Sequence, residues 1–154
     1  MIYPGTTFSS LPEAYHLTKV DWQLFGTGTT RNHFPSRRYV LNRVIATIRQ
    51  VCRVSSRKDA ERIMLFCRFE HPGELLHVHF LMAGIPEHLD SNQFGLAFAR
   101  QWTRRVGICR VEPYDTQRDG IGYVTKSSSD DNERDLAQPY FSPALITHLV
   151  GSVT

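Results

Sequence analysis

The chain has 154 residues, of which 41% are hydrophobic, enough for one globular domain with its own core. Its formal net charge of +3 is too small to indicate polyanion binding by itself. There is no apolar run of about eighteen residues, and residues 1–10 lack the basic start and apolar stretch of a signal peptide. We therefore expect a soluble, cytosolic protein without a membrane partner.

Hydrophobic periodicity predicts strands and helices after an irregular arm at residues 1–14. The expected elements, in chain order, are a strand at residues 20–27, a polar loop at 26–36, a helix at 36–53, hairpin strands at 61–69 and 75–82, a helix from an N-cap at Asp90 to Gly107, and a strand at 108–112. This order predicts an α+β sandwich in which helices flank a central antiparallel sheet.

Two histidines alternate with apolar residues in the second hairpin strand. Because side chains on a strand switch faces at every residue, His77 and His79 should emerge on one face, while Val78 points into the core. Two surface histidines on a half-exposed strand would give the same pattern by chance.

A turn centred on Pro72 and Gly73 joins the two hairpin strands in this prediction. Such a turn would place Glu70 opposite Leu75, on the same face as His77 and diagonal to it. A carboxylate and two imidazoles would then converge. This mixed nitrogen and oxygen set suits a divalent ion such as Mn²⁺, Mg²⁺, Co²⁺ or Zn²⁺.

A second motif lies in residues 116–126, where Tyr123 and Lys126 are three residues apart. If this segment is helical, the two side chains lie on one face. Tyrosine can act as a covalent nucleophile, and a nearby cation can stabilise its phenolate or a phosphate under attack. The same spacing is also typical of a packed ring beside a solvated lysine.

The order of these motifs resembles that of the HUH endonucleases. An acidic residue, a His-hydrophobic-His strand and a later Tyr-x-x-Lys are similar to the nuclease domain of single-tyrosine replication initiators (Rep). Phe69-Glu70 before the turn looks like the metal motif of parvovirus-type Rep nucleases. The resemblance spans residues 20–126. It implies an HUH endonuclease domain at 1–126, with an HUH/RRM-like sandwich fold, followed by an acidic linker and C-terminal segment at 127–154 that packs on the same domain.

This resemblance implies a metal-dependent enzyme that nicks and rejoins single-stranded DNA. Glu70, His77 and His79 would hold the ion, with Mn²⁺ or Mg²⁺ preferred. Tyr123 would attack the phosphodiester, while Lys126 orients the phosphate or stabilises the tyrosinate. A 5′-phosphotyrosine link and a free 3′-OH would result, and the hydroxyl would prime rolling-circle replication.

The implied DNA partner is an unpaired strand at a replication origin, for instance in a hairpin loop. No Walker-type Gly-Lys-Ser/Thr sequence occurs, so a helicase and a polymerase would have to be supplied separately. The enzyme would act in the cytoplasm of a bacterium or of the host cell of a plasmid or virus, or in the nucleus for a eukaryotic virus.

Other functions use the same residues differently. An HUH transposase would share the chemistry, whereas plasmid relaxases more usually carry three histidines. A DNA-binding module would keep the fold without a metal, and a metal-dependent hydrolase would use water as its nucleophile. Tyr123→Phe separates these functions, because it abolishes covalent joining but leaves simple hydrolysis intact.

Fifteen of the eighteen basic residues are arginine, whose guanidinium group can bind phosphate through two hydrogen bonds. Arg31, Arg68 and Gln23 are candidate DNA contacts. Alternative explanations are solvated helix faces for the arginines, an ion pair with Glu70 for Arg68, and ordinary strand-surface polarity for Gln23. Three cysteines, widely spaced among apolar neighbours, predict buried reduced thiols. Residues 139–150 regain apolar character and are expected to pack back as a short helix or strand.

Overall fold

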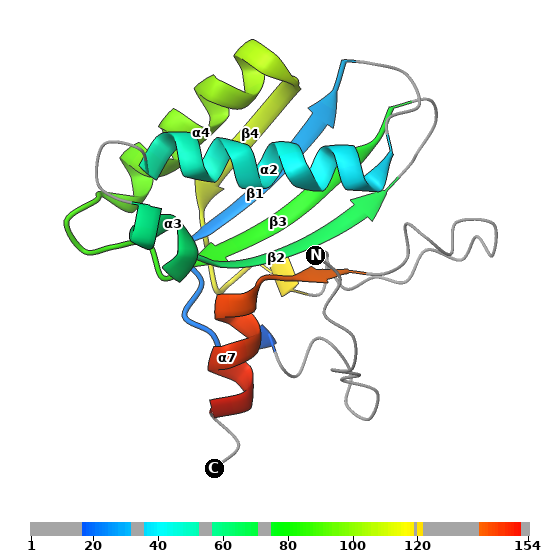
Figure 1. The fold of residues 1–154 in the computed structure, drawn as a ribbon. Helices are drawn as coiled ribbons and strands as arrows, with labels where there is room; N and C mark the ends of the chain where they lie inside the picture. Colours follow the sequence, from blue (N-terminus) through cyan, green and yellow to red (C-terminus); the bar gives the residue numbers. More distant parts are fainter. Residues whose placement is uncertain are drawn as a thin grey trace, which may run out of the picture.

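The computed structural model describes residues 17–31, 36–52, 57–70, 75–118, 120–121 and 139–151. These ranges contain five strands and four helices, and the predicted α+β class is confirmed (Figure 1). No helix within them is long and apolar enough to cross a membrane. The elements are β1 (Leu24–Thr30), α2 (Arg37–Val51), α3 (Arg57–Arg62), β2 (Met64–Glu70), β3 (His77–Ala83), α4 (Ser91–Arg105), β4 (Gly107–Pro113), β5 (Tyr140–Phe141) and α7 (Pro143–Gly151).

The strands form one antiparallel sheet in the order β4-β1-β3-β2-β5. Helices α2 and α3 connect β1 to β2, and β3 lies between these two strands in the sheet. Helix α4 connects β3 to β4, and β1 lies between these two strands. This is the split βαβ arrangement, and right-handed crossovers bring both connecting helices to one face. In agreement, α2 crosses the strands in Figure 1 and contacts α4.

The face beneath α2 and α4 holds the main hydrophobic core. As predicted, α4 begins after Asp90, whose carboxylate accepts a hydrogen bond from the Gln93 backbone N–H at 2.9 Å. Ser36 caps α2 in the same way, accepting from the Tyr39 N–H at 3.1 Å. Buried residues of the two helices then pack on this face of the sheet: Val40, Val44 and Ile48 of α2 and Phe94, Phe98 and Trp102 of α4.

β1 departs from the prediction, because it covers Leu24–Thr30 and not residues 20–27. Residues 20–23 precede the strand, where the Trp22 indole N–H donates to the Leu17 carbonyl at 2.8 Å. Residues 28–30 were predicted as loop. Gly28 and Thr29 pair with both β3 and β4, and Thr30 pairs with β4. β1 is therefore an interior strand that begins and ends later than the sequence pattern suggested.

α3 is a second departure, since residues 61–62 end this helix and do not begin the hairpin strand. The C-terminal segment returns to the sheet both as a strand and as a helix. β5 pairs with β2, and the Ser142 hydroxyl before α7 accepts from the Leu65 backbone N–H at 2.9 Å. These bonds hold α7 at the lower end of the sheet in Figure 1.

The face opposite α2 is covered at one end by a second hydrophobic cluster. The segment before β1 and helix α7 supply its outer layer, and alternate residues of β2 and β3 supply the sheet side. The rest of this face carries mostly polar side chains, with the exposed Ile108 of β4 as an exception. The buried members of the cluster are Leu17, Val20, Trp22, Phe66, Leu81, Ala83, Leu145 and Leu149.

Candidate functional site

Polar and charged side chains gather on the sheet face opposite α2, beyond the second hydrophobic cluster. They share that face because alternate residues of each strand point the same way and the pairing keeps the strands in register. These residues are Thr27 and Thr29 of β1, Arg68 and Glu70 of β2, His77 and His79 of β3, and Arg110 and Glu112 of β4.

β2 and β3 pair so that Glu70 lies directly opposite His77, and Arg68 lies opposite His79. The predicted register, with Glu70 opposite Leu75 and Arg68 opposite His77, is wrong by two residues. Since side chains alternate with a period of two, a shift of two leaves each residue on its predicted face. The turn at residues 72–73 lies outside the described part of the chain.

His79 is held at both ring nitrogens. Its Nε2 lies 2.9 Å from Glu70 Oε2, and its Nδ1 lies 3.0 Å from Thr27 Oγ1. The His79 side chain is 4% exposed, whereas that of Glu70 is 34% exposed, so the carboxylate forms the solvent side of this pair. Contacts from two neighbouring strands therefore fix the orientation of the imidazole.

His77 lies on the same face, opposite Glu70 of β2 and Thr29 of β1, and is half-buried. Among the described residues, no three His, Cys, Asp or Glu side chains are arranged as a metal-binding group. The structure thus brings Glu70 and His79 into contact and places His77 across from Glu70, without assembling a three-ligand set. The metal site stays a prediction.

Glu70 and His79 are close enough for both side chains to reach one ion. Ligands about 2.1 Å from an octahedral ion and at right angles to each other are about 3.0 Å apart. The carboxylate oxygen and the imidazole nitrogen are 2.9 Å apart, which is also the length of an ordinary hydrogen bond, so an ion bound by both would replace that bond and require one side chain to turn. Oxygen and nitrogen together suit the divalent ions predicted from the sequence.

A surface cavity of about 340 Å³ begins beside this pair, at Thr27. The cavity lies between β1, β4 and the residues that follow β4, and Phe25 and Tyr114 provide its aromatic lining. Thr27 contacts His79 as well as the cavity, so the two features adjoin. We call it the side cavity.

Four charged residues line the side cavity and pair with one another. Glu112 Oε2 lies 3.4 Å from Arg110 Nη2 and 3.8 Å from Arg118 Nη1, and Asp115 Oδ2 lies 3.8 Å from Arg118 Nε. The side chains of Arg110 and Arg118 are 80% and 73% exposed. Exposed pairs of this kind stabilise a fold little, so both guanidinium groups can contact an anion at low cost.

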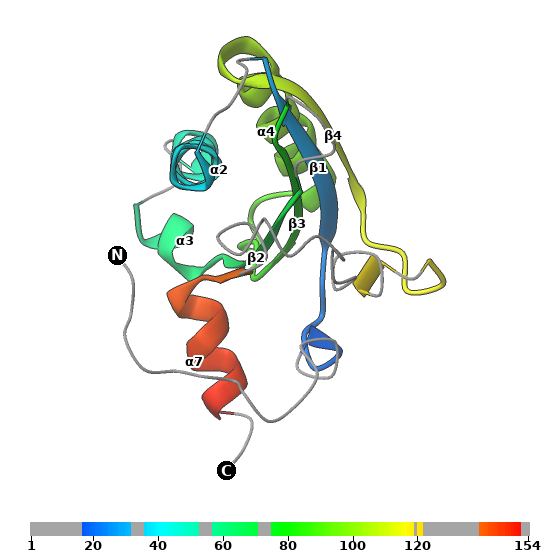
Figure 2. The ribbon, with the colours of Figure 1, turned by 90° about the vertical axis from the view of Figure 1, so that its right-hand side faces the viewer.

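Tyr123 and Lys126 lie outside the described residues. The chain just before them, at Gly120 and Ile121, lies on the side of the sheet opposite α2 (Figure 2). Gly120 lines the side cavity, where a Cβ would lie 3.1 Å from Tyr114 Cε2, and Ile121 packs against the second hydrophobic cluster. Residues 120–121 thus lie on the side of the sheet that carries the histidines.

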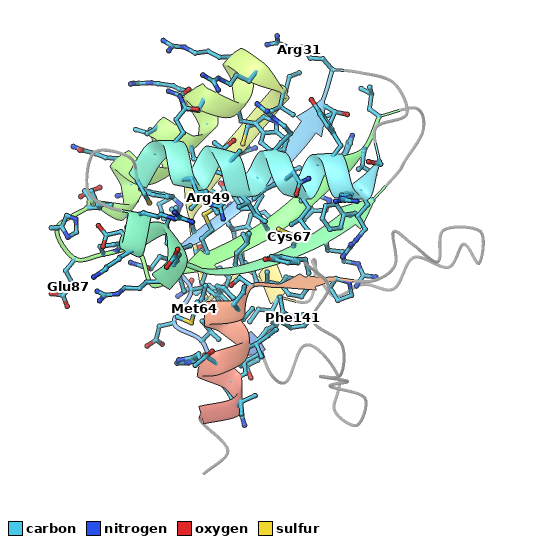
Figure 3. The ribbon with its side chains drawn as sticks, viewed as in Figure 1. Arg31, Arg49, Met64, Cys67, Glu87 and Phe141 are labelled. Atoms are coloured by element: carbon cyan, nitrogen blue, oxygen red, sulfur yellow. The ribbon has the colours of Figure 1, made fainter. Side chains whose placement is uncertain are left out.

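Arg31, a predicted DNA contact, makes structural hydrogen bonds at the end of α4. Its backbone N–H donates to the Val106 carbonyl at 2.9 Å, and its guanidinium donates to the Thr103 carbonyl. Figure 3 shows Arg31 at the top of the molecule, where β1 ends. These bonds place a cation at the C-terminus of α4, where its charge interacts favourably with the helix dipole.

Gln23 and Arg68 differ in their relation to the site. The Gln23 side-chain carbonyl accepts a hydrogen bond from the Ile85 N–H at 2.8 Å, which ties the loop after β3 to the start of β1. Arg68 is 6% exposed and lies opposite His79, on the face of the candidate site. Arg68 is therefore the member of the predicted DNA-contact set that lies closest to the histidines in the sheet.

The cysteines are free, and Cys52 and Cys67 are buried as predicted, whereas Cys109 is half-buried. Burial raises the pKa of Cys52 to about 11, with a further contribution from Asp59, and raises that of Cys109 to about 12. Burial also raises the pKa of Cys67, which lies in the sheet below α2 in Figure 3. These groups stay protonated at neutral pH and are poor metal ligands in that form.

Sequence reasoning did not identify Thr27, Arg110, Glu112 and Arg118 as residues of this region. The alternation of Arg110 and Glu112 in a strand was a usable signal, because it puts them on one face. A comparison of the chain with known protein families, characterised proteins and solved structures finds no match. The case for a function rests on the residues and their geometry.

Proposed function

We propose that this chain is an HUH-type nickase and strand-rejoining enzyme that acts on single-stranded DNA with a divalent ion. The contact between Glu70 and His79 on an antiparallel sheet, with His77 opposite Glu70, is the observation that carries this proposal. The packing of Ile121 on the same side of the sheet is a second support, because Tyr123 follows within two residues.

Glu70, His77 and His79 are the proposed ligands of the ion. An ion held there would polarise the scissile phosphodiester and stabilise the charge that develops on it. Thr27 holds the His79 ring at Nδ1, so Nε2 already faces Glu70, and an ion would replace the bond between Nε2 and Glu70. Arg68 adds a cation opposite His79.

Tyr123 is the proposed nucleophile. Its phenolate oxygen attacks the phosphorus, so a bond from phosphorus to tyrosine forms and the bond to the 3′ oxygen breaks. The leaving oxygen takes up a proton and becomes a free 3′-OH, and the 5′ phosphate stays on the tyrosine. Lys126 orients the phosphate or stabilises the tyrosinate. The reverse attack by a 3′-OH rejoins the strand without ATP, because the phosphoester bond is conserved.

The side cavity gives the strand a route toward the ligands. Arg110 and Arg118 offer exposed guanidinium groups to phosphates, and Tyr114 offers a ring on which a base can stack. A strand that follows this route must be unpaired, as in the loop of a hairpin at an origin. The 3′-OH released there would prime rolling-circle synthesis, with the helicase and polymerase provided by other proteins.

Transfer of a DNA label to the protein tests this function. The full chain is incubated with Mn²⁺ and single-stranded oligonucleotides labelled at the 3′ end, and the products are separated on a denaturing protein gel. We expect labelled protein that disappears with EDTA and in Tyr123→Phe. The matched control is Tyr39→Phe, which alters a tyrosine that is 38% exposed on α2, across the sheet from the site, and should leave the band intact.

Other outcomes identify the alternatives. DNA binding without labelled protein, across varied hairpins and metals, would indicate a non-catalytic binding module. Free cleaved DNA without labelled protein would indicate a hydrolase in which water attacks. A transposase shares the covalent step with a replication initiator, and would in addition join the retained strand to an unrelated target DNA.

A further inference from the structure

The Thr27 hydroxyl connects the His79 ring to the neighbouring strand. Thr27 of β1 is the direct cross-strand partner of His79 of β3, and Thr27 Oγ1 lies 3.0 Å from His79 Nδ1. The His79 side chain is 4% exposed, so little water reaches the ring. A neighbouring hydroxyl is therefore important for satisfying the hydrogen-bonding capacity of Nδ1.

A neutral imidazole carries one hydrogen, and the ion would decide which nitrogen holds it. Without an ion, an N–H at Nε2 can donate to Glu70 Oε2 at 2.9 Å, and the Thr27 hydroxyl can donate to Nδ1. When Nε2 binds an ion, the hydrogen must sit on Nδ1, which then donates to Thr27 Oγ1. The hydrogen moves by exchange with solvent, and the hydroxyl only rotates, because it is both donor and acceptor.

We propose that Thr27 is a positioning residue that satisfies His79 Nδ1 in both states and thereby sets the affinity of the Glu70 and His79 pair for a divalent cation. The outer partner of a metal-bound histidine typically changes metal affinity by about 10- to 100-fold. The inference rests on the proposed function for its ion but not on the DNA or on Tyr123. Valine in place of Thr27 keeps the shape and removes the hydrogen bond.

The first test is the affinity of the full chain for Mn²⁺ alone, measured by the electron paramagnetic resonance signal of the free ion without DNA. We expect Thr27→Val to bind Mn²⁺ at least about tenfold more weakly than wild type, and Thr27→Ser to restore the affinity. Thr47→Val is the matched control, because it removes a part-buried threonine hydroxyl on α2, across the sheet from the site, where Thr47 Oγ1 donates to the Arg43 carbonyl at 2.7 Å. It should bind Mn²⁺ like wild type.

The second test locates the ring hydrogen by ¹⁵N NMR of the histidines at fixed pH, with Mg²⁺ or Zn²⁺ as the diamagnetic ion. His79→Gln identifies the signals of His79. We expect the hydrogen on Nε2 in the metal-free chain and on Nδ1 after the ion is added. This measurement on the wild type keeps the inference falsifiable even if Thr27→Val fails to fold, because an ion bound through Nδ1 would exclude the proposed role of Thr27.

Three results would overturn the inference. The first is a Thr27→Val chain that binds Mn²⁺ as tightly as wild type. The second is binding of the ion through His79 Nδ1. The third is a Thr27→Ser chain that binds Mn²⁺ as weakly as the valine variant. Failure of the proposed function looks different. Mn²⁺ binding that depends on Thr27, without any covalent DNA adduct, would remove the nickase and keep the inference, whereas a wild-type chain that binds no Mn²⁺ would overturn both.

Discussion

Replacement of Gly28 by alanine tests the packing that sets the path of β1 beneath the site. Gly28 faces the core, and a Cβ there would lie 2.8 Å from both Cε2 and Cζ2 of Trp102. Carbon atoms in contact are normally about 3.5–4.0 Å apart, so the indole would have to move by about 1 Å. Trp102 is fully buried and stacks on Phe98 at a centroid distance of 6.1 Å, which leaves it little room.

The expected loss of stability combines three contributions. Overpacking of a well-packed core costs about 1–3 kcal/mol. Movement of the indole weakens the bond from Trp102 Nε1 to the Thr29 carbonyl, now 3.3 Å long, which contributes about 1 kcal/mol. Alanine recovers about 0.5–1 kcal/mol relative to glycine in a strand. We therefore expect Gly28→Ala to lower the free energy of unfolding by about 2 kcal/mol.

Urea unfolding followed by circular dichroism measures this change. Gly151→Ala at the end of α7 is the control, because no atom lies within 4 Å of the added Cβ, and we expect no loss of stability. In a Trp102→Phe background the smaller ring leaves space for the methyl group, so Gly28→Ala should cost less there. Equal losses in both backgrounds, or a Gly28→Ala chain as stable as wild type, would refute the packing proposed for β1.

Three further predictions concern α7, the side cavity and the thiols. Leu149→Ala, at a position 2% exposed, should lower the free energy of unfolding by about 2–5 kcal/mol, whereas Val150→Ala, at 52% exposed, should change it little; urea unfolding measures both. Arg118→Gln should weaken single-stranded DNA binding and reduce the slope of log affinity against log salt by about 0.7, as measured by fluorescence anisotropy. Because the folded pKa of Cys52 is about 11 and the ordinary value is 9.0, its contribution to stability should be complete below pH 9 and lost as pH rises toward 11. Unfolding at about pH 8 and about pH 10.5 checks this.

The contrary results are equally specific. An unchanged free energy of unfolding in Leu149→Ala would mean that α7 does not depend on its docking in the second cluster. An unchanged salt slope in Arg118→Gln would remove this residue from the DNA path. A free energy of unfolding that does not fall between the two pH values would contradict burial of the thiols.

The two long helices were predictable because their own residues encode them. Ser36 and Asp90 cap α2 and α4, and apolar residues follow the helical period in both. α3 was missed because its six residues form no apolar stripe, and its one buried residue is Asp59. Asp59 Oδ2 lies 3.4 Å from His88 Nε2, a contact between residues far apart in the sequence. Local periodicity carries no information of that kind.

The end of β1 was missed for a three-dimensional reason. Its Gly-Thr-Gly-Thr-Thr run has the composition of a loop, yet it pairs on both sides. A Cβ at Gly26 or Gly28 would collide with the ring of Phe80 or Trp102, respectively, so each glycine supplies the space that an aromatic ring from another element occupies. The glycines make sense only once those rings are in place.

For the candidate site, the sequence predicted which residues share a face of the sheet better than it predicted which residues are cross-strand partners. Alternation puts His77 and His79 on one face, the predicted turn adds Glu70 to it, and the structure agrees. The register depends on the connection between the strands, so Glu70 was paired with Leu75 in the prediction instead of His77. The role of Thr27 needed the neighbouring strand, which no local pattern identifies.

Mass spectrometry of the covalent adduct tests the central claim most directly. Trypsin should release Tyr123 in the peptide covering residues 119–126 and the nearby Tyr114 in a separate peptide covering residues 111–118. After reaction with a short single-stranded oligonucleotide and Mn²⁺, followed by nuclease trimming, we predict a nucleotide 5′-phosphate on Tyr123 within the first peptide. A nucleotide linked through its 5′ phosphate to the peptide that contains Tyr114 would contradict Tyr123 as the nucleophile. Unmodified peptides under conditions in which the DNA is cleaved would also contradict it.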